Sequence, residues 1–152
     1  MKKVLIFSLL AALMGGTIAC KKDVDEDKLI TDYLTTNKLV AEKTPEGIYF
    51  IVETQGTGNF PTLSNTVSVR YKGYLLDGTV FDENQTATKP VFTTVLGGGI
   101  ITGWKIGLQK FKKGGKGKLF IPSAYAYGSS GSGGVIKGNT PIAFEIDLVD
   151  VK

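Results

Sequence analysis

Residues 66–82 read TVSVRYKGYLLDGTVFD, and this stretch decides the fold. Apolar side chains alternate along its first half, as at Val67 and Val69, which is the spacing of a β-strand with one buried face. The pair Asp77-Gly78 predicts a tight hairpin turn, because both central residues of such a turn need a positive φ. We therefore expect two antiparallel strands that meet at this turn.

Four further strands are expected on either side of the hairpin. Each is a short apolar run bounded by glycine, proline or polar residues, and several of the runs alternate in polarity. These runs are residues 48–54, 92–96, 118–121 and 141–149.

Helical spacing of apolar residues occurs in two places. An amphipathic helix is expected over residues 26–38, with Asp25 or Asp27 available as its N-cap. A second helix is expected over residues 103–111, and the glycine-rich residues 113–117 end it. An antiparallel sheet with one short central helix is an α+β fold.

The composition excludes several kinds of chemistry. The chain has 152 residues, enough for one domain with its own core, and it contains no His. Histidine-dependent hydrolases, His-ligated zinc and imidazole acid–base catalysis are therefore excluded, and the single Cys excludes an internal disulfide or a cysteine-based metal cluster. The glycine-rich residues 97–99 and 128–134 lack the Lys of a phosphate-binding loop. Any activity must come from shape, apolar surface, backbone groups, carboxylates and hydroxyls.

Residues 1–19 are typical of an export signal, with two Lys, an apolar run and small residues up to Ala19. The apolar run Val4–Met14 is too short for a stable membrane span. Cys20 follows Thr17-Ile18-Ala19, which resembles a bacterial lipoprotein cleavage box with Thr17 at the usual Leu position. We expect Cys20 to carry lipid, and an ordinary signal peptide followed by an incidental Cys is the alternative.

Charge gives no sign of a nucleic-acid partner. Removal of residues 1–19 takes away two of the 18 basic residues and none of the 14 acidic ones, so the net charge falls from +4 to +2. The remaining lysines are spread along the chain without aromatic stacking platforms beside them.

Residues 21–27, KKDVDED, are either a solvated tether or, by resemblance, the acidic surface-display signal of some Bacteroidetes lipoproteins. We expect an exported protein, anchored by lipid to the outer membrane at its periplasmic face or at the cell surface.

Seven short motifs occur together in one order and spacing. They are VRYKGY (69–74), DGTVFD (77–82), IITGW (100–104), GL (107–108), IP (121–122), AYAYG (124–128) and TPIAFEIDL (140–148). Over residues 45–151 the sequence thereby resembles the FKBP-type peptidyl-prolyl cis-trans isomerases. The resemblance implies an antiparallel half-barrel of five or six strands wrapped around one short helix. Together with the N-terminal pattern, it divides the chain into a lipoprotein signal peptide (1–19), a segment with the lipidated Cys, charged tether and short amphipathic helix (20–44), and an isomerase domain (45–152).

The resemblance implies an active site in an apolar cleft between helix and sheet. The residues at the family's catalytic positions are Tyr71, Phe81, Asp82, Trp104, Tyr127 and Phe144. The residues at its substrate-binding positions are Phe92, Ile100, Ile101 and Ile136, the last in the loop that covers the cleft. Trp104 would form the floor under the proline ring, and Asp82 would face the rotating amide. The Ile101 backbone N–H and the Tyr127 hydroxyl would each hold a substrate carbonyl.

The implied reaction suits a chain without His or a reactive thiol. Rotation about an Xaa-Pro bond breaks no covalent bond, and its barrier of ~20 kcal/mol is the loss of amide resonance. An apolar cleft weakens that resonance, and aromatic walls can fit the twisted amide better than either planar form. The resemblance therefore implies no cofactor and no metal.

The expected partners are proline-containing exported proteins, macrolide ligands of the immunophilin kind, and the membrane through the lipid anchor. Two alternatives remain open for the function. One is a binding module or holdase chaperone that uses the same cleft without turnover. The other is a purely structural surface lipoprotein.

Overall fold

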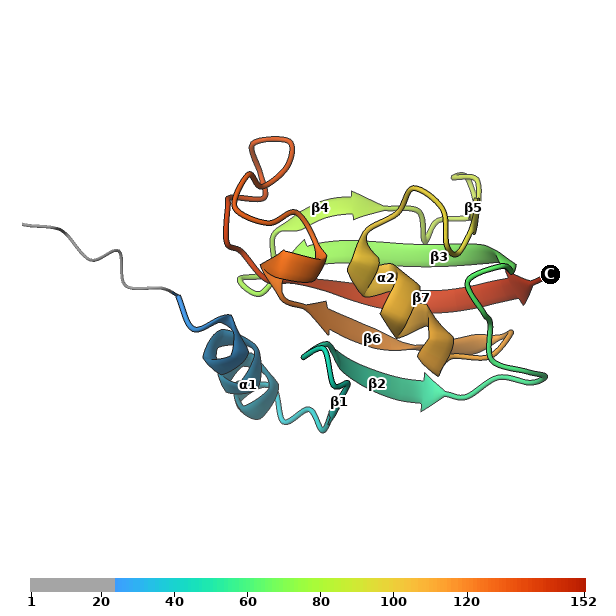
Figure 1. Ribbon diagram of the computed structural model, residues 1–152, viewed down its shortest axis with the longest axis horizontal. Coiled ribbons are helices and arrows are strands. Elements are labelled where there is room, and N and C mark those ends of the chain that lie inside the picture. The colour runs from blue at the N-terminus through green and yellow to red at the C-terminus, as the bar shows by residue number, and fades with distance from the viewer. Residues whose placement is uncertain (1–23) are drawn as a thin grey trace, which may run out of the picture.

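The computed structural model describes residues 24–152, and the expected signal peptide and Cys20 lie outside the described residues. In this part of the chain one antiparallel sheet carries a short helix across one face and a longer helix near one end (Figure 1). The elements are α1 (Glu26–Thr36), β1 (Glu42–Lys43), β2 (Tyr49–Thr54), β3 (Thr66–Leu75), β4 (Val80–Glu83), β5 (Phe92–Val95), α2 (Thr102–Gly107), β6 (Gly115–Ile121) and β7 (Ile142–Val151), with 3₁₀ turns η1 (Leu108–Lys110) and η2 (Ser123–Tyr125).

The strand order is β1-β2-β6-β7-β3-β4, and β5 also pairs with β3. The strand β3 contributes residues 66–69 to the pairing with β5 and residues 72–74 to the pairing with β4, so both partners lie along the same edge. Seven strands therefore fill six positions in the sheet. The expected α+β fold, with an antiparallel sheet around one short helix, is confirmed, and the two-residue β1 is an addition that the sequence pattern did not indicate.

The first helix forms where the sequence places an N-cap and an apolar stripe. Asp25 accepts a hydrogen bond from the Lys28 backbone N–H at 3.0 Å, so Asp25 rather than Asp27 is the cap. Ile30 and Leu34 are four residues apart and therefore lie on one side of the helix, where both are buried. They pack in a small apolar cluster with side chains from the sheet: Tyr49, Tyr74, Phe120 and Ala143.

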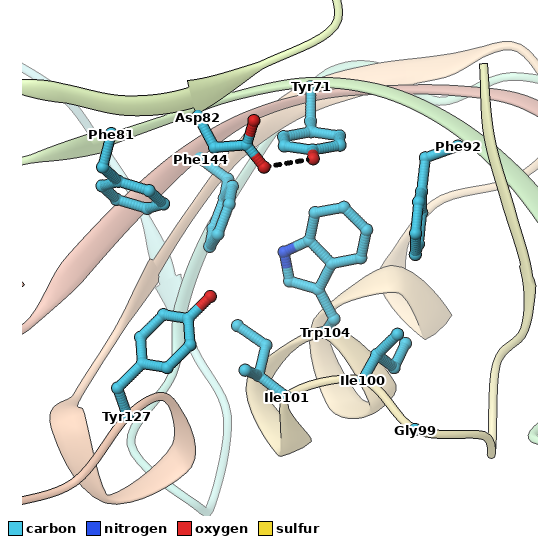
Figure 2. Close-up of a pocket in the computed structure, with 10 residues that line it drawn as sticks. All are labelled: Tyr71, Phe81, Asp82, Phe92, Gly99, Ile100, Ile101, Trp104, Tyr127 and Phe144. Atoms are coloured by element: carbon cyan, nitrogen blue, oxygen red, sulfur yellow. Dashed lines mark hydrogen bonds between the residues drawn. The ribbon is translucent and has the colours of Figure 1, made fainter. Parts of the chain in front are cut away.

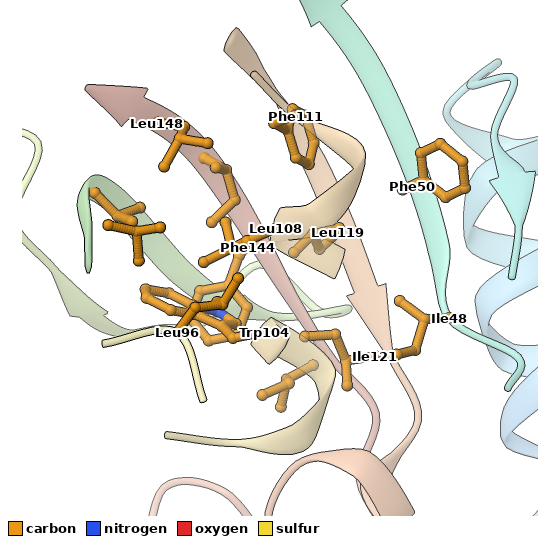
Figure 3. Close-up of a cluster of buried hydrophobic side chains, with 14 of the residues drawn as sticks. Ile48, Phe50, Leu96, Trp104, Leu108, Phe111, Leu119, Ile121, Phe144 and Leu148 are labelled. Atoms are coloured by element: carbon orange, nitrogen blue, oxygen red, sulfur yellow. The ribbon is translucent and has the colours of Figure 1, made fainter. Parts of the chain in front are cut away.

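The two helices pack on opposite faces of the sheet. Successive side chains of a strand point to opposite faces, so one strand contributes to the apolar cluster under each helix. In β6, Leu119 and Ile121 belong to the main core under α2, whereas Phe120 between them belongs to the cluster under α1. Figure 3 shows part of the main core between α2 and the strands. Its largest fully buried side chains include Phe111, Leu108, Leu119, Ile121 and Leu148.

The segment around α2 differs in its boundaries from the expected one. The helix expected over residues 103–111 consists of α2 and the 3₁₀ turn η1, and the strand expected from residue 118 begins at Gly115. Gly103 and Gly107 are four residues apart and face the sheet. A Cβ at Gly107 would lie 2.6 Å from a methyl group of Leu119, so the absence of a side chain there allows α2 to approach β6 closely.

Among residues 24–152, no helix has both the length and the apolar character that crossing a bilayer would require.

Candidate active site

A cavity of about 260 Å³ opens between α2 and the sheet (Figure 2). Nine of the ten residues expected at the cleft line it. The full lining is Tyr71, Phe81, Asp82, Phe92, Gly99, Ile100, Ile101, Trp104, Tyr127 and Phe144. The structure therefore brings together side chains that are up to 73 positions apart in the sequence, as in the pair Tyr71 and Phe144.

Each wall of the cavity comes from a different element. Tyr71 lies on β3, Phe144 on β7 and Phe92 on β5, and the two β4 residues Phe81 and Asp82 complete the sheet side. Across the cavity, Ile100 and Ile101 precede α2, Trp104 lies in its first turn, and Tyr127 follows the turn η2. Antiparallel pairing places β4, β3 and β7 side by side, with Gly73 opposite both Asp82 and Phe144.

Trp104 lies at the base of the cavity among aromatic rings (Figure 2). Its ring centroid is 5.0 Å from that of Tyr71, 5.2 Å from that of Phe144 and 5.8 Å from that of Phe92. All three pairs meet edge to face, with interplanar angles between 75° and 83°, a geometry worth ~0.5–1.5 kcal/mol a pair. Trp104 is 5% exposed, so the indole is held rigidly under an apolar surface.

The polar side-chain groups of the cavity are one carboxylate, two phenols and the indole N–H of Trp104. The Tyr71 hydroxyl donates a hydrogen bond of 2.6 Å to Asp82 Oδ2. Burial, and then the hydrogen bond to Asp82, raise the pKa of Tyr71 well above its ordinary value. Burial, and then the negative charge of Asp82, also raise the pKa of Tyr127. Both phenols therefore keep their protons at neutral pH and are hydrogen-bond donors.

Besides the buried indole N–H of Trp104, two donors at the cavity have no acceptor within residues 24–152. One is the Tyr127 hydroxyl, which points into the cavity in Figure 2. The other is the backbone N–H of Ile101, the residue at the N-cap position of α2, whose carbonyl by contrast accepts from Trp104 at 3.1 Å. Buried or half-buried donors are normally paired, so these two are available to carbonyl groups of a ligand.

Ile136 is the expected site residue that does not line the cavity. It is buried in the main core, and its backbone forms an antiparallel bridge with Ser132, with N–O distances of 2.8 and 3.0 Å. The bridge closes the glycine-rich loop that precedes β7, and Val135 is the exposed large hydrophobic residue of that loop. The expected function of Ile136 at the cleft stays a prediction. The individual roles of the nine residues that do line the cavity also stay predictions.

The residues singled out from the sequence did not include Asn84, which supports the cavity wall from behind. Asn84 is 7% exposed, and its Oδ1 accepts from the Tyr71 N–H at 2.7 Å. Its Nδ2 donates to the carbonyls of Val69 at 3.1 Å and Pro90 at 3.3 Å, which joins β3 to the loop before Phe92. An Asn in a polar, Thr-rich stretch is typical of an exposed turn, so the sequence carries no signal for this role. Gly99, which lines the cavity with its backbone, was also missed, because a glycine in a glycine-rich stretch has no side chain that would indicate such a role.

No group of three or more His, Cys, Asp or Glu residues within residues 24–152 is arranged to hold a metal ion.

Known proteins resemble this chain in sequence and in structure. A family model described as FKBP-type peptidyl-prolyl cis-trans isomerase matches residues 58–149. FK506-binding protein 1 of Dictyostelium discoideum is 38% identical over 107 residues, which cover 70% of this chain and 99% of that protein. The FKBP-type peptidyl-prolyl cis-trans isomerase FkpA of Buchnera aphidicola is 36% identical over 139 residues, or 89% of this chain.

The crystal structure of FkpA from Escherichia coli superimposes with a TM-score of 0.74 and 36% identity, over 87% of this chain and 62% of that one. The chain spans 54% of the length of the Buchnera relative, so it matches only part of that protein. The family model nevertheless covers more than half of the chain, including strands β3 to β6, most of β7, α2 and the cavity. The chain belongs to the FKBP-type peptidyl-prolyl cis-trans isomerase family.

Proposed function

We propose that this protein accelerates cis–trans rotation of Xaa-Pro bonds in exported proteins. The observation that carries the proposal is the aromatic cavity with two donors at its edge, the Ile101 N–H and the Tyr127 hydroxyl, that have no acceptor in the described part of the chain. Family membership supports the same reaction. A cavity of about 260 Å³ suits a proline ring and the amide before it, and the rest of the polypeptide remains outside.

Catalysis follows from the difference between the planar and twisted amides. The planar amide is charge-separated and is stabilised by water, so its removal into an apolar cavity lowers the barrier of ~20 kcal/mol. The proline ring would rest on Trp104, while the Ile101 N–H and the Tyr127 hydroxyl hold substrate carbonyls. Asp82, which is fixed by its bond from Tyr71, would face the amide as it rotates. Each 1.4 kcal/mol of preference for the twisted form contributes about a factor of ten in rate.

A peptide isomerisation assay on the purified protein tests this proposal. We expect clear acceleration by the wild type, about a tenfold loss of kcat/KM in Asp82→Val, and about a threefold loss in Tyr127→Phe, because the first removes a charged partner and the second one neutral hydrogen bond. Asp32→Ala, which removes an exposed carboxylate of α1 paired with Lys28, is the control and should leave kcat/KM unchanged. FK506, the compound after which the Dictyostelium relative is named, is the inhibitor to test in the same assay.

The alternatives lead to different results in that assay. Acceleration equal to that of buffer would refute the isomerase proposal. Binding of unfolded client proteins without acceleration would instead support the holdase, and the absence of both turnover and cavity ligands would support a structural lipoprotein.

We also propose that the protein is exported and held at the outer membrane by lipid on Cys20, which the residues before Cys20 support. Several acyl chains, at ~0.8 kcal/mol per buried CH₂, are enough for a stable anchor. Metabolic labelling with a palmitate analogue should mark the wild-type protein and should fail in Cys20→Ala. Labelling that persists in this variant would contradict the anchor site, whatever the result of the isomerase assay.

A further inference from the structure

The first helix is joined to the segment that carries Tyr127 by one carboxylate. Glu26 Oε2 accepts a hydrogen bond from the Ser123 backbone N–H at 2.6 Å, and Glu26 Oε1 accepts from the Ser123 hydroxyl at 2.5 Å. The two residues are 97 positions apart, and Ser123 is 5% exposed. Bonds to an ionised carboxylate are roughly twice as strong as neutral ones, so this contact fixes Ser123 firmly.

Ser123 in turn holds the backbone on both sides of Tyr127. The Ser123 carbonyl accepts from the Ala126 N–H at 2.9 Å and from the Gly128 N–H at 2.8 Å. Tyr127 lies between these two donors, and its hydroxyl is at the cavity. All the hydrogen-bonding groups of Ser123 are therefore engaged, two with Glu26 and one with the turn that orients Tyr127.

The position of Glu26 is itself well defined. It lies in the first turn of α1, where Asp25 caps the helix and the buried pair Ile30 and Leu34 attaches it to the sheet. The next residue, Asp27, makes separate bonds to Lys43 at 2.5 Å and to the Tyr49 hydroxyl at 2.9 Å. An acidic residue in the first turn also stabilises a helix through its interaction with the helix dipole, but that stabilisation needs no contact with Ser123.

We propose that Glu26 is a positioning residue for Tyr127, acting through Ser123 and the turn up to Gly128. The expected effect of Glu26 on the rate rests on the proposed isomerase function. The structural half of the inference, that Glu26 orders the turn that carries Tyr127, is independent of catalysis. Without the carboxylate, the Ser123 N–H and hydroxyl lose their partner and the turn gains freedom. The Tyr127 hydroxyl then spends less time where it can bond a substrate carbonyl, although the residues of the cavity wall are unchanged.

Amide hydrogen exchange in the full chain, purified in detergent, tests the structural half. In Glu26→Ala we expect exchange of the Ala126 and Gly128 amides to accelerate at least about tenfold, because a local opening costs less. Glu26→Gln, which retains an acceptor of the same length, should restore most of the protection. Asp27→Ala is the matched control, because it removes two bonds from the same helix turn but none to Ser123. Equal exchange in the wild type and Glu26→Ala would overturn the proposal, as would equal acceleration in Asp27→Ala.

A double-mutant cycle on kcat/KM tests the functional half. Glu26→Ala should lower kcat/KM about twofold in the wild-type background, within the threefold loss expected when the hydroxyl is removed, and have almost no effect in Tyr127→Phe, because the hydroxyl that it positions is already absent. Equal losses in the two backgrounds would show that Glu26 acts on the fold rather than on Tyr127, and would overturn the positioning role. If the wild type itself shows no acceleration, the isomerase proposal fails, and the exchange measurement still decides whether Glu26 orders the turn.

Discussion

Replacement of Trp104 by alanine is expected to lower kcat/KM for a proline peptide about fiftyfold. The indole forms the base of the cavity, and three methylene groups of a proline ring would rest on it. At ~0.8 kcal/mol per buried CH₂, loss of that surface removes about 2.4 kcal/mol from binding of the transition state, and each 1.4 kcal/mol is a factor of ten. The edge-to-face contacts that orient Tyr71, Phe92 and Phe144 are lost at the same time.

The same change should lower the free energy of unfolding by ~3–5 kcal/mol, so the rate must be expressed per folded molecule. Phe111→Ala is the matched control, because Phe111 is fully buried in the same core cluster but does not line the cavity. The Phe111→Ala protein should lose about as much free energy of unfolding as Trp104→Ala and keep the kcat/KM of the wild type per folded molecule. The folded fraction is measured by circular dichroism. If both variants lose kcat/KM to the same extent, Trp104 has no special part in the reaction.

The sequence predicts the sheet and the cavity well because both depend on strong local patterns. The alternation in β3 and the Asp77-Gly78 turn define the central hairpin whatever surrounds them. Eight of the nine cleft residues lie in the family motifs, which preserve the spacing that brings Tyr71 and Phe144 together, and Phe92 was assigned from the resemblance outside those motifs. The residues alone would not have sufficed, because an aromatic side chain in a β-rich domain is most often simply part of the core.

Other features depend on contacts that no local pattern encodes. Glu26 resembles any acidic residue at a helix start, and only the tertiary structure places it against Ser123. Asn84 resembles an exposed turn residue, yet its side chain bonds three backbone groups of the cavity wall. Ile136 lies in a glycine-rich loop, and its burial follows from the bridge with Ser132 rather than from hydrophobic periodicity.

The beginning of β6 illustrates how tertiary pairing overrides local preference. Glycine is unfavourable in a strand, so residues 113–117 were expected only to end the preceding helix, and the strand was expected to begin at residue 118. Instead Gly115 and Gly117 pair with Leu148 and Ile146 of β7, and Gly117 also pairs with Val52 of β2. A glycine inside a strand often marks a place where another backbone comes close, and Gly117 is such a place.

Gly117→Ala is therefore expected to destabilise the protein by about 3 kcal/mol or more, at the upper end for overpacking of a core. An added Cβ would overlap the carbonyl oxygen of Ile51 on β2 and would lie 2.8 Å from the Phe111 ring. The oxygen belongs to the backbone of a paired strand, so it cannot move away without loss of the β2–β6 pairing. The thermal midpoint should fall by at least ~10 °C, measured by circular dichroism.

Gly99→Ala provides the comparison for this prediction, because an added Cβ there meets no atom within 4 Å. Its free energy of unfolding should stay within ~0.5 kcal/mol of the wild type, as for most surface changes. A Gly117→Ala protein with the same midpoint as Gly99→Ala would mean that β2 can separate from β6 without loss of stability. In that case the close approach at Gly117 would not be what requires glycine in this strand, and the strand would tolerate a side chain on the face that packs against Phe111.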